Sequence, residues 1–106
     1  MSKLPDRYTG IGRKYKKYFT ALNNLGKAAR TAGPLDEKTS HLIQLAAAAA
    51  VKSEGSVHSH ARRAIEAGAT PEELYHALIV VTSTIGFPAV SAGISWLDDV
   101  LSRDSK

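Results

Sequence analysis

The stretch SEGSVHSHARRAIEAGATPEE, residues 53–73, holds the strongest helix signals in the chain. Gly68 is the residue type that most often follows the end of a helix, because it adopts a left-handed backbone without steric cost. Beyond it, Thr70 offers a capping hydroxyl, Pro71 suits the first helical position, and Glu73 stands at the reciprocal capping-box position. This spacing predicts that one helix ends just before the glycine and that the next begins just after the threonine.

Apolar residues recur at helical spacing downstream of this stretch. The helix that begins at Thr70 should continue until Gly-Phe-Pro, residues 86–88, interrupts it. Its apolar stripe consists of Leu74, Ala77, Leu78, Val81 and Ile85. A further helix is expected beyond the break, with a stripe that consists of Val90, Ile94, Leu97, Val100 and Leu101. Ala92 and Gly93 are small enough to let a neighbouring helix come close.

Two more helices are expected upstream. Asp36 is a suitable N-cap for a helix that runs to about Lys52. Its five consecutive alanines, residues 46–50, favour a helix and carry almost no side-chain bulk, so another helix can approach closely. An earlier helix should run from Arg13 to the Gly-Pro pair at residues 33–34. Its apolar stripe consists of Tyr15, Tyr18, Phe19, Leu22, Leu25 and Ala29.

The patterns together predict an all-α fold. No segment of the 106 residues shows the sustained alternation of a strand, so we expect a bundle of about five helices. Gly55 should mark the break between the second and the third. We expect residues 1–12, which contain a proline and two glycines, to form an irregular arm. Residues 13–103 should form a single helical domain and residues 104–106 a frayed tail.

Composition excludes several classes of chemistry. The chain contains no cysteine, which rules out disulfides, thiolate metal sites and thiol redox cycles within it. Hydrophobic residues make up 43% and charged residues 23%, which is typical of a folded globular protein. We see no secretory signal, and the longest apolar run, residues 45–51, is far shorter than the roughly 20 residues that span a bilayer. We therefore expect a cytoplasmic protein that does not bind membranes.

Charge is distributed unevenly along the chain. Residues 1–30 carry eight lysines or arginines against one acidic residue, a local charge of +7. The remaining residues carry six basic and nine acidic side chains, a charge of −3. The basic segment could face nucleic acid, an anionic membrane, water, or an acidic surface of a neighbouring subunit. Solvent exposure is favoured and nucleic acid disfavoured, because no nucleic-acid-binding motif accompanies the charge.

The histidines are the side chains best suited to transfer protons near neutral pH, and they stand at positions 41, 58, 60 and 76. His58 and His60 are two residues apart and so point about 200° from each other on a helix. Ser53, Ser56 and His60 are spaced three and four apart and share one face. No acidic residue completes a catalytic triad and no nucleophile elbow is present, so a capping role for the serines is favoured over a serine hydrolase.

The pattern Ser53-x-x-Ser56-x-x-x-His60, followed by an alanine and the residues Gly-Ala-Thr at 68–70, resembles the signature of the carboxymuconolactone decarboxylase family. In the AhpD-like branch, which supports alkyl hydroperoxide reduction, this signature reads C-x-x-C-x-x-x-H. The resemblance extends over about residues 33–101. It implies an AhpD-like helical bundle built around a helical hairpin, and an assembly of identical chains as a trimer or hexamer.

Two departures from the family pattern affect the chemistry that the resemblance implies. Both cysteine positions are serine, and a serine hydroxyl forms neither a sulfenic acid nor a disulfide, so thiol peroxidase activity of the AhpD type is not expected. The position twelve residues before the first cysteine usually holds a proton-relay glutamate, and here it holds His41.

The decarboxylase branch does not need the cysteines, so the resemblance implies a cofactor-independent lyase or a related acid–base enzyme that acts on a small anionic organic molecule. Loss of carbon dioxide from a carboxylated lactone leaves an enolate that needs a positioned general acid. His60 and His41 are the predicted proton carriers, with Ser53 and Ser56 beside them. No cofactor or metal is implied, although the paired imidazoles could also bind an anion, or a metal together with His58.

Three further residues are candidate substrate contacts. Arg63 could attract a substrate carboxylate, although a solvated arginine is the simpler interpretation. His58 could join the two central imidazoles, and Trp96 could form an apolar wall, although burial in the core or in a subunit interface suits an indole as well. A non-catalytic binding or assembly subunit that kept the scaffold is the alternative function.

Overall fold

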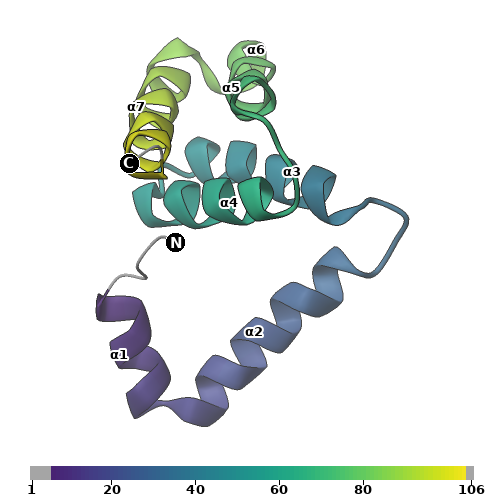
Figure 1. Cartoon of the computed structure of the whole chain (residues 1–106), viewed down its shortest axis with the longest axis vertical. Helices are drawn as coiled ribbons and strands as arrows, with labels where there is room; N and C mark the ends of the chain where they lie inside the picture. Colours follow the sequence, from purple (N-terminus) through teal and green to yellow (C-terminus); the bar gives the residue numbers. More distant parts are fainter. Residues whose placement is uncertain (1–5, 105–106) are drawn as a thin grey trace. The chain divides into compact units, whose positions relative to one another are not determined.

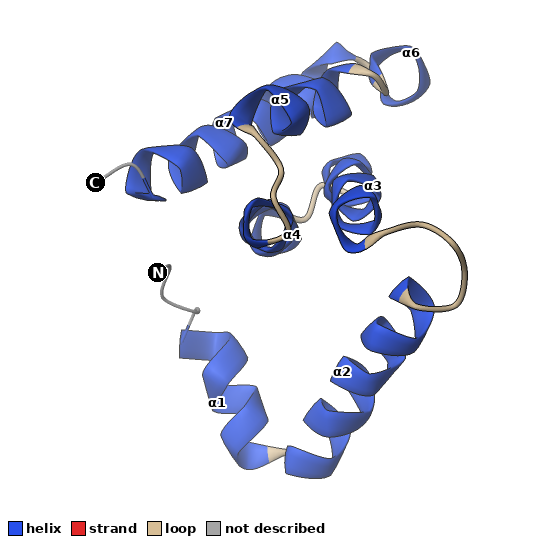
Figure 2. Cartoon of the chain, turned by 45° about the vertical axis from the view of Figure 1, so that its right-hand side comes forward, coloured by secondary structure: helices blue, strands red, loops and turns tan. Residues whose placement is uncertain are grey.

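The computed structural model describes residues 6–104, and within that range all regular secondary structure is helical (Figure 2). The helices are α1 Asp6–Lys14, α2 Lys16–Arg30, α3 Glu37–Ala50, α4 Glu54–Glu66, α5 Pro71–Ile79, α6 Thr82–Ile85 and α7 Phe87–Asp104. The predicted all-α fold is confirmed. Among the described residues, no helix combines the length and the apolarity needed to cross a bilayer.

The chain divides into two compact units, one ending at Asp36 and the other beginning at Glu37. This division differs from the single domain that we expected over residues 13–103. The physical reason lies in α2, which contributes no buried residue, whereas the buried apolar side chains that the structure describes all come from the second unit. Residues 105–106 of the expected tail lie outside the described residues, and Asp104 still belongs to α7.

The first unit is a helical pair rather than an arm followed by a helix. Residues 6–12 belong to α1, so the expectation of an irregular segment is wrong there, and residues 1–5 lie outside the described part. The rings of Tyr8 and Phe19 meet edge to face with centroids 4.8 Å apart. A Cβ atom on Gly12 would come within 3.1 Å of the Phe19 ring. Gly12, one of the glycines that suggested an irregular arm, therefore provides space for an aromatic contact between α1 and α2.

The apolar stripe predicted along α2 is present but does not form a core. Most of its members face solvent along the whole helix, with Tyr18 near the start 60% exposed and Leu25 in the second half 67% exposed. Phe19 is the half-buried member because Tyr8 packs against it. Helical periodicity thus predicted the spacing of these residues correctly without predicting their burial.

The second unit is built on the hairpin of α3 and α4, which lie side by side (Figures 1 and 2). The turn between them uses Lys52 in the left-handed region, with φ of 59°. Ser53 N–H donates to the Ala48 carbonyl at 2.9 Å, and Lys52 N–H donates to the Ala49 carbonyl at 3.1 Å. This Schellman arrangement ends α3 at Ala50, two residues before the predicted end.

Helices α5 and α7 cover this hairpin and enclose the core (Figure 2). The largest fully buried side chains are Leu45, Leu74, Leu78, Leu97, Val57, Val90 and Val100. A Cβ atom on Gly93 would lie 3.1 Å from the Ala49 Cβ and 3.3 Å from a methyl carbon of Leu78. The small residues singled out on two separate segments therefore meet where α7 crosses α3.

The predicted helix from Thr70 through Ile85 is interrupted. It ends at Ile79, and a short α6 begins at Thr82. The Thr82 hydroxyl donates to the Ile79 carbonyl at 2.6 Å, an alternative to continuous helical bonding that threonine readily supplies. Gly86 then adopts φ of 90° and separates α6 from α7.

Candidate active site on the α3–α4 hairpin

Local signals place two histidines on facing helices. His41 stands in the second turn of α3, one turn after Glu37. At the start of α4, the Ser53 hydroxyl accepts a hydrogen bond from the Ser56 backbone N–H at 3.3 Å, which defines where the helix begins. His60 follows in the second turn of α4. Because the short turn folds α4 back along α3, the two imidazoles meet.

The Nδ1 atoms of His41 and His60 lie 3.2 Å apart. Their ring centroids are 5.5 Å apart and the ring planes are inclined by 32°. Two ring nitrogens at this distance form a hydrogen bond only when one carries the proton and the other accepts it. The His41 residue is only 3% exposed whereas His60 is half-buried, so His60 is the member of the pair with greater access to solvent.

Glu37 supports the pair from the other side of His41. Its Oε2 atom lies 3.4 Å from the His41 Nε2 atom. A carboxylate at this position favours a proton on Nε2, which leaves the His41 Nδ1 atom as the acceptor for His60. Glu37 is a residue of the site that the sequence analysis did not single out. Its separation of four residues from His41 was the signal that could have identified this contact.

The predicted serines act in the helix cap. Ser53 holds the N-cap position of α4 in extended backbone, and its hydroxyl is bonded to the N–H of Ser56. Both residues are half-buried. The structure therefore bears out the capping interpretation of Ser53.

His58 points to different partners from those of His60. Its Nε2 atom lies 3.8 Å from Asp99 Oδ2 and 4.0 Å from Glu54 Oε2. His58 and His60 therefore point in different directions from α4, as expected for residues two apart on a helix. His58 belongs to a separate cluster formed by α4 and α7, and does not complete a set of three imidazoles with His41.

Arg63 and Trp96, the two remaining candidate substrate contacts, are both half-buried. Arg63 is half-buried in the last turn of α4, where a positive charge complements the helix dipole. Trp96 on α7 is half-buried and packs against the hydrophobic core of the second unit, as the core interpretation of its indole expected. These positions alone assign neither residue a role in substrate binding.

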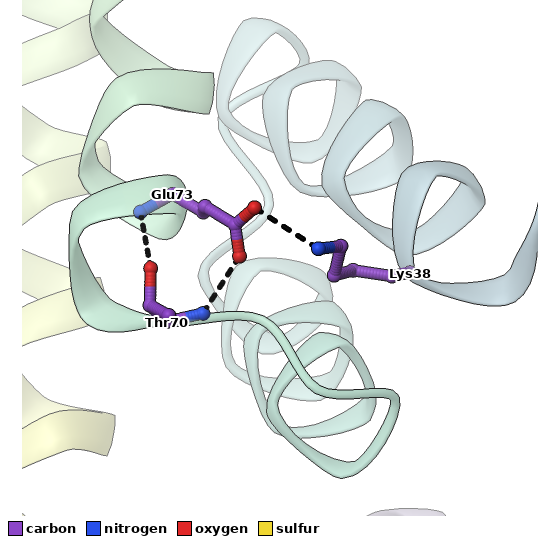
Figure 3. Close-up of polar contacts among 3 residues, drawn as sticks. All are labelled: Lys38, Thr70 and Glu73. Carbon is purple, nitrogen blue, oxygen red and sulfur yellow. Dashed lines mark hydrogen bonds and ion pairs between the residues drawn. The ribbon is translucent and has the colours of Figure 1, made fainter.

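A polar cluster ties the first turn of α3 to the start of α5 (Figure 3). The predicted capping box is present, with Glu73 N–H donating to the Thr70 hydroxyl at 3.1 Å and Thr70 N–H donating to the Glu73 carboxylate at 2.9 Å. Lys38 donates to the same carboxylate at 3.0 Å. The Thr70 backbone N–H, followed by Lys38, holds the pKa of Glu73 below its ordinary value. The residue next to Glu37 is therefore anchored to α5.

Comparison with known proteins identifies relatives that match most of the chain. The model of the Carboxymuconolactone decarboxylase family matches residues 16–99. An uncharacterized protein of Methanocaldococcus jannaschii is 33% identical over 78 residues, which make up 74% of this chain and 73% of that protein. A carboxymuconolactone decarboxylase family protein from Legionella pneumophila, solved in its apo form, matches with a TM-score of 0.79 and 26% identity. The match covers 91% of this chain and 86% of that one.

Proposed function

Because this chain belongs to the carboxymuconolactone decarboxylase family and contains no cysteine, we propose that it is a cofactor-independent acid–base enzyme of the lyase type, acting on a small carboxylated molecule. The observation that carries this proposal is the contact of 3.2 Å between the Nδ1 atoms of His41 and His60. A buried imidazole behind a more accessible one is suited to hold and deliver a proton. Peroxide reduction that depends on cysteine thiols is excluded for this chain, because serine hydroxyls cannot perform it.

The Glu37 carboxylate sets the direction of the proton relay. The proposed tautomers follow from two contacts, 3.4 Å between His41 Nε2 and the Glu37 carboxylate and 3.2 Å between the two Nδ1 atoms. The carboxylate accepts the Nε2–H of His41 in this proposal, so the Nδ1 atom of His41 accepts the Nδ1–H of His60. In this neutral arrangement the Nε2 atom of His60 has a lone pair. A second proton on that atom makes His60 a general acid, and the nearby carboxylate offsets the added charge.

The proposed step is a decarboxylation followed by protonation. The carbon–carbon bond to a substrate carboxylate breaks, carbon dioxide leaves, and the electron pair remains on the substrate as an enolate. The Nε2–H of His60 then delivers its proton to the enolate carbon, and the pair returns to the neutral arrangement. Water supplies the proton for the next cycle. Arg63, three residues after His60 on α4, is the cation that we propose attracts the substrate carboxylate.

The test compares turnover of a carboxylated lactone, followed by release of carbon dioxide, in the wild type and in His60→Gln. We expect the variant to lose at least about 100-fold in kcat, which is the usual contribution of a positioned general acid. His76→Gln is the matched control, because His76 is an exposed histidine on α5. Circular dichroism should show equal helix content in all three proteins.

The outcomes separate the two functions. Unchanged turnover in His60→Gln would remove His60 from the mechanism. If the wild type consumes no carboxylated lactone but retains one in equilibrium dialysis, the alternative function as a binding subunit is favoured instead.

A further inference from the structure

A second cluster of ligating side chains lies where α4 meets α7. Glu54 and His58 stand one turn apart on α4, and Asp99 approaches them from α7. One donor atom from each residue lies within 4.8 Å of the other two. The His58 side chain is only 14% exposed, whereas the Glu54 and Asp99 side chains are 57% and 54% exposed. An imidazole anchored by packing therefore stands beside two carboxylates that can move.

The separations within this cluster are longer than those of direct hydrogen bonds. The His58 Nε2 atom lies 4.0 Å from the Glu54 oxygen and 3.8 Å from the Asp99 oxygen, and both distances exceed that of a hydrogen bond. A single N–H on that atom could point at only one of the two oxygens. A cation between the three atoms would interact with all of them and offset the repulsion between the carboxylates.

We propose that Glu54, His58 and Asp99 bind a divalent transition-metal ion. One imidazole nitrogen with two carboxylate oxygens is a donor set that suits zinc and its neighbours in the first transition series. Two ligands of one such ion, each about 2.1 Å from it, stand roughly 3.0–3.4 Å apart. The exposed carboxylates need to move by less than about 1 Å to reach this spacing, which side-chain rotation permits.

The consequence of metal binding follows from where the ligands stand. Because α4 supplies two ligands and α7 the third, the ion would join two helices whose packing forms part of the core. Binding to the folded state alone should raise the midpoint of thermal unfolding. The site is independent of the proposed acid–base function, since His58 faces Asp99 on α7 whereas His60 faces His41 on α3.

The test is calorimetric titration of tag-free, metal-free protein with Zn²⁺, together with thermal unfolding in the presence and absence of Zn²⁺. We expect one Zn²⁺ per chain and a rise in Tm. His58→Gln should abolish both effects, and Asp99→Asn should weaken binding at least about tenfold. The double variant of His41 and His60 to Gln should bind like the wild type.

Three results would overturn the proposal. One is the absence of Zn²⁺ binding to the wild type, and another is binding by His58→Gln with unchanged affinity. The third is loss of binding in the double variant of His41 and His60, which would place the ion at the imidazole pair. If His58→Gln fails to fold, Asp99→Asn still decides, because its side chain is more than half exposed. The matched control is Glu66→Gln, because Glu66 carries an exposed carboxylate on the same helix as Glu54.

Discussion

The Nδ1 atoms of His41 and His60 approach to 3.2 Å, so the protonation of one imidazole constrains the protonation of the other. They come from separate helices and stand 19 residues apart in the chain. Glu37 extends this pair into a row of three groups that runs from a solvent-exposed carboxylate through a buried imidazole to a half-buried one.

Glu37→Gln tests whether the carboxylate positions the relay. We expect kcat to fall about ten- to a hundredfold while KM is unchanged, because Glu37 acts through His41 rather than on the substrate. Nitrogen NMR should show the His41 proton on Nε2 in the wild type and a mixture of tautomers in the variant. A rise in KM alone, with the tautomer unaltered, would contradict the positioning role.

Glu73→Gln tests the polar link between α3 and α5. The pKa of Glu73 is held below its ordinary value of 4.5, so its ionised form is favoured by folding. The stability that it contributes is therefore fully present above pH 4.5 and is lost as the pH falls through its pKa in the folded state. Urea unfolding should show a wild-type advantage over the variant at pH 7 that disappears in acid. An advantage that persists in strong acid would contradict this assignment, and Glu72→Gln is the neighbouring control.

Gly93→Ala tests the crossing of α7 over α3. The added methyl group would come within 3.1 Å of the Ala49 Cβ, and we expect the free energy of unfolding to fall by about 1–3 kcal/mol. Adding Ala49→Gly should recover part of this loss. Gly55→Ala is the matched control, because its new methyl group meets nothing within 4 Å and should stabilise the helix by about 0.5–1 kcal/mol. Equal effects of the two glycine substitutions would argue against a close crossing.

Lys52→Gly and Gly68→Ala test the two helix ends of the hairpin. Both residues have positive φ, at 59° and 101°. Glycine at position 52 should remove strain and raise the free energy of unfolding by about 0.5–1 kcal/mol, whereas alanine at position 68 should lower it by about 1–2 kcal/mol. Chemical denaturation measures both changes. Opposite signs are the expected signature, and a destabilising Lys52→Gly would show that the lysine side chain itself is needed.

We propose that the chain self-associates through the exposed apolar face of α2. The double variant Leu22→Ser with Leu25→Ser should then lower the mass of the assembled protein. The two leucines are 46% and 67% exposed, and their burial between copies would stabilise an oligomer. The basic charge of the first unit and the acidic balance of the rest of the chain would favour such contacts. Light scattering measures the mass, with Asn24→Ser on another face of α2 as the control. A monomeric wild type would contradict the proposal.

Local signals in the sequence predicted much of the secondary structure. Thr70 and Glu73 form the expected capping box, and Gly68 ends α4 with positive φ. These features depend on backbone bonds within a few residues, so spacing is enough to identify them. Spacing does not predict the break at Ile79, because the apolar pattern continues past it while the Thr82 hydroxyl bonds to the Ile79 carbonyl.

By itself the sequence determined that the chain is helical, that it lacks the sulfur on which thiol chemistry depends, and that imidazoles are its best proton carriers. Only the tertiary structure decided that His41 meets His60, that Glu37 stands behind them, and that His58 turns toward Asp99. It also decided that the apolar stripe of α2 remains exposed. The physical reason is that periodicity specifies the face of a helix on which a residue lies, whereas the packing of helices decides what that face contacts.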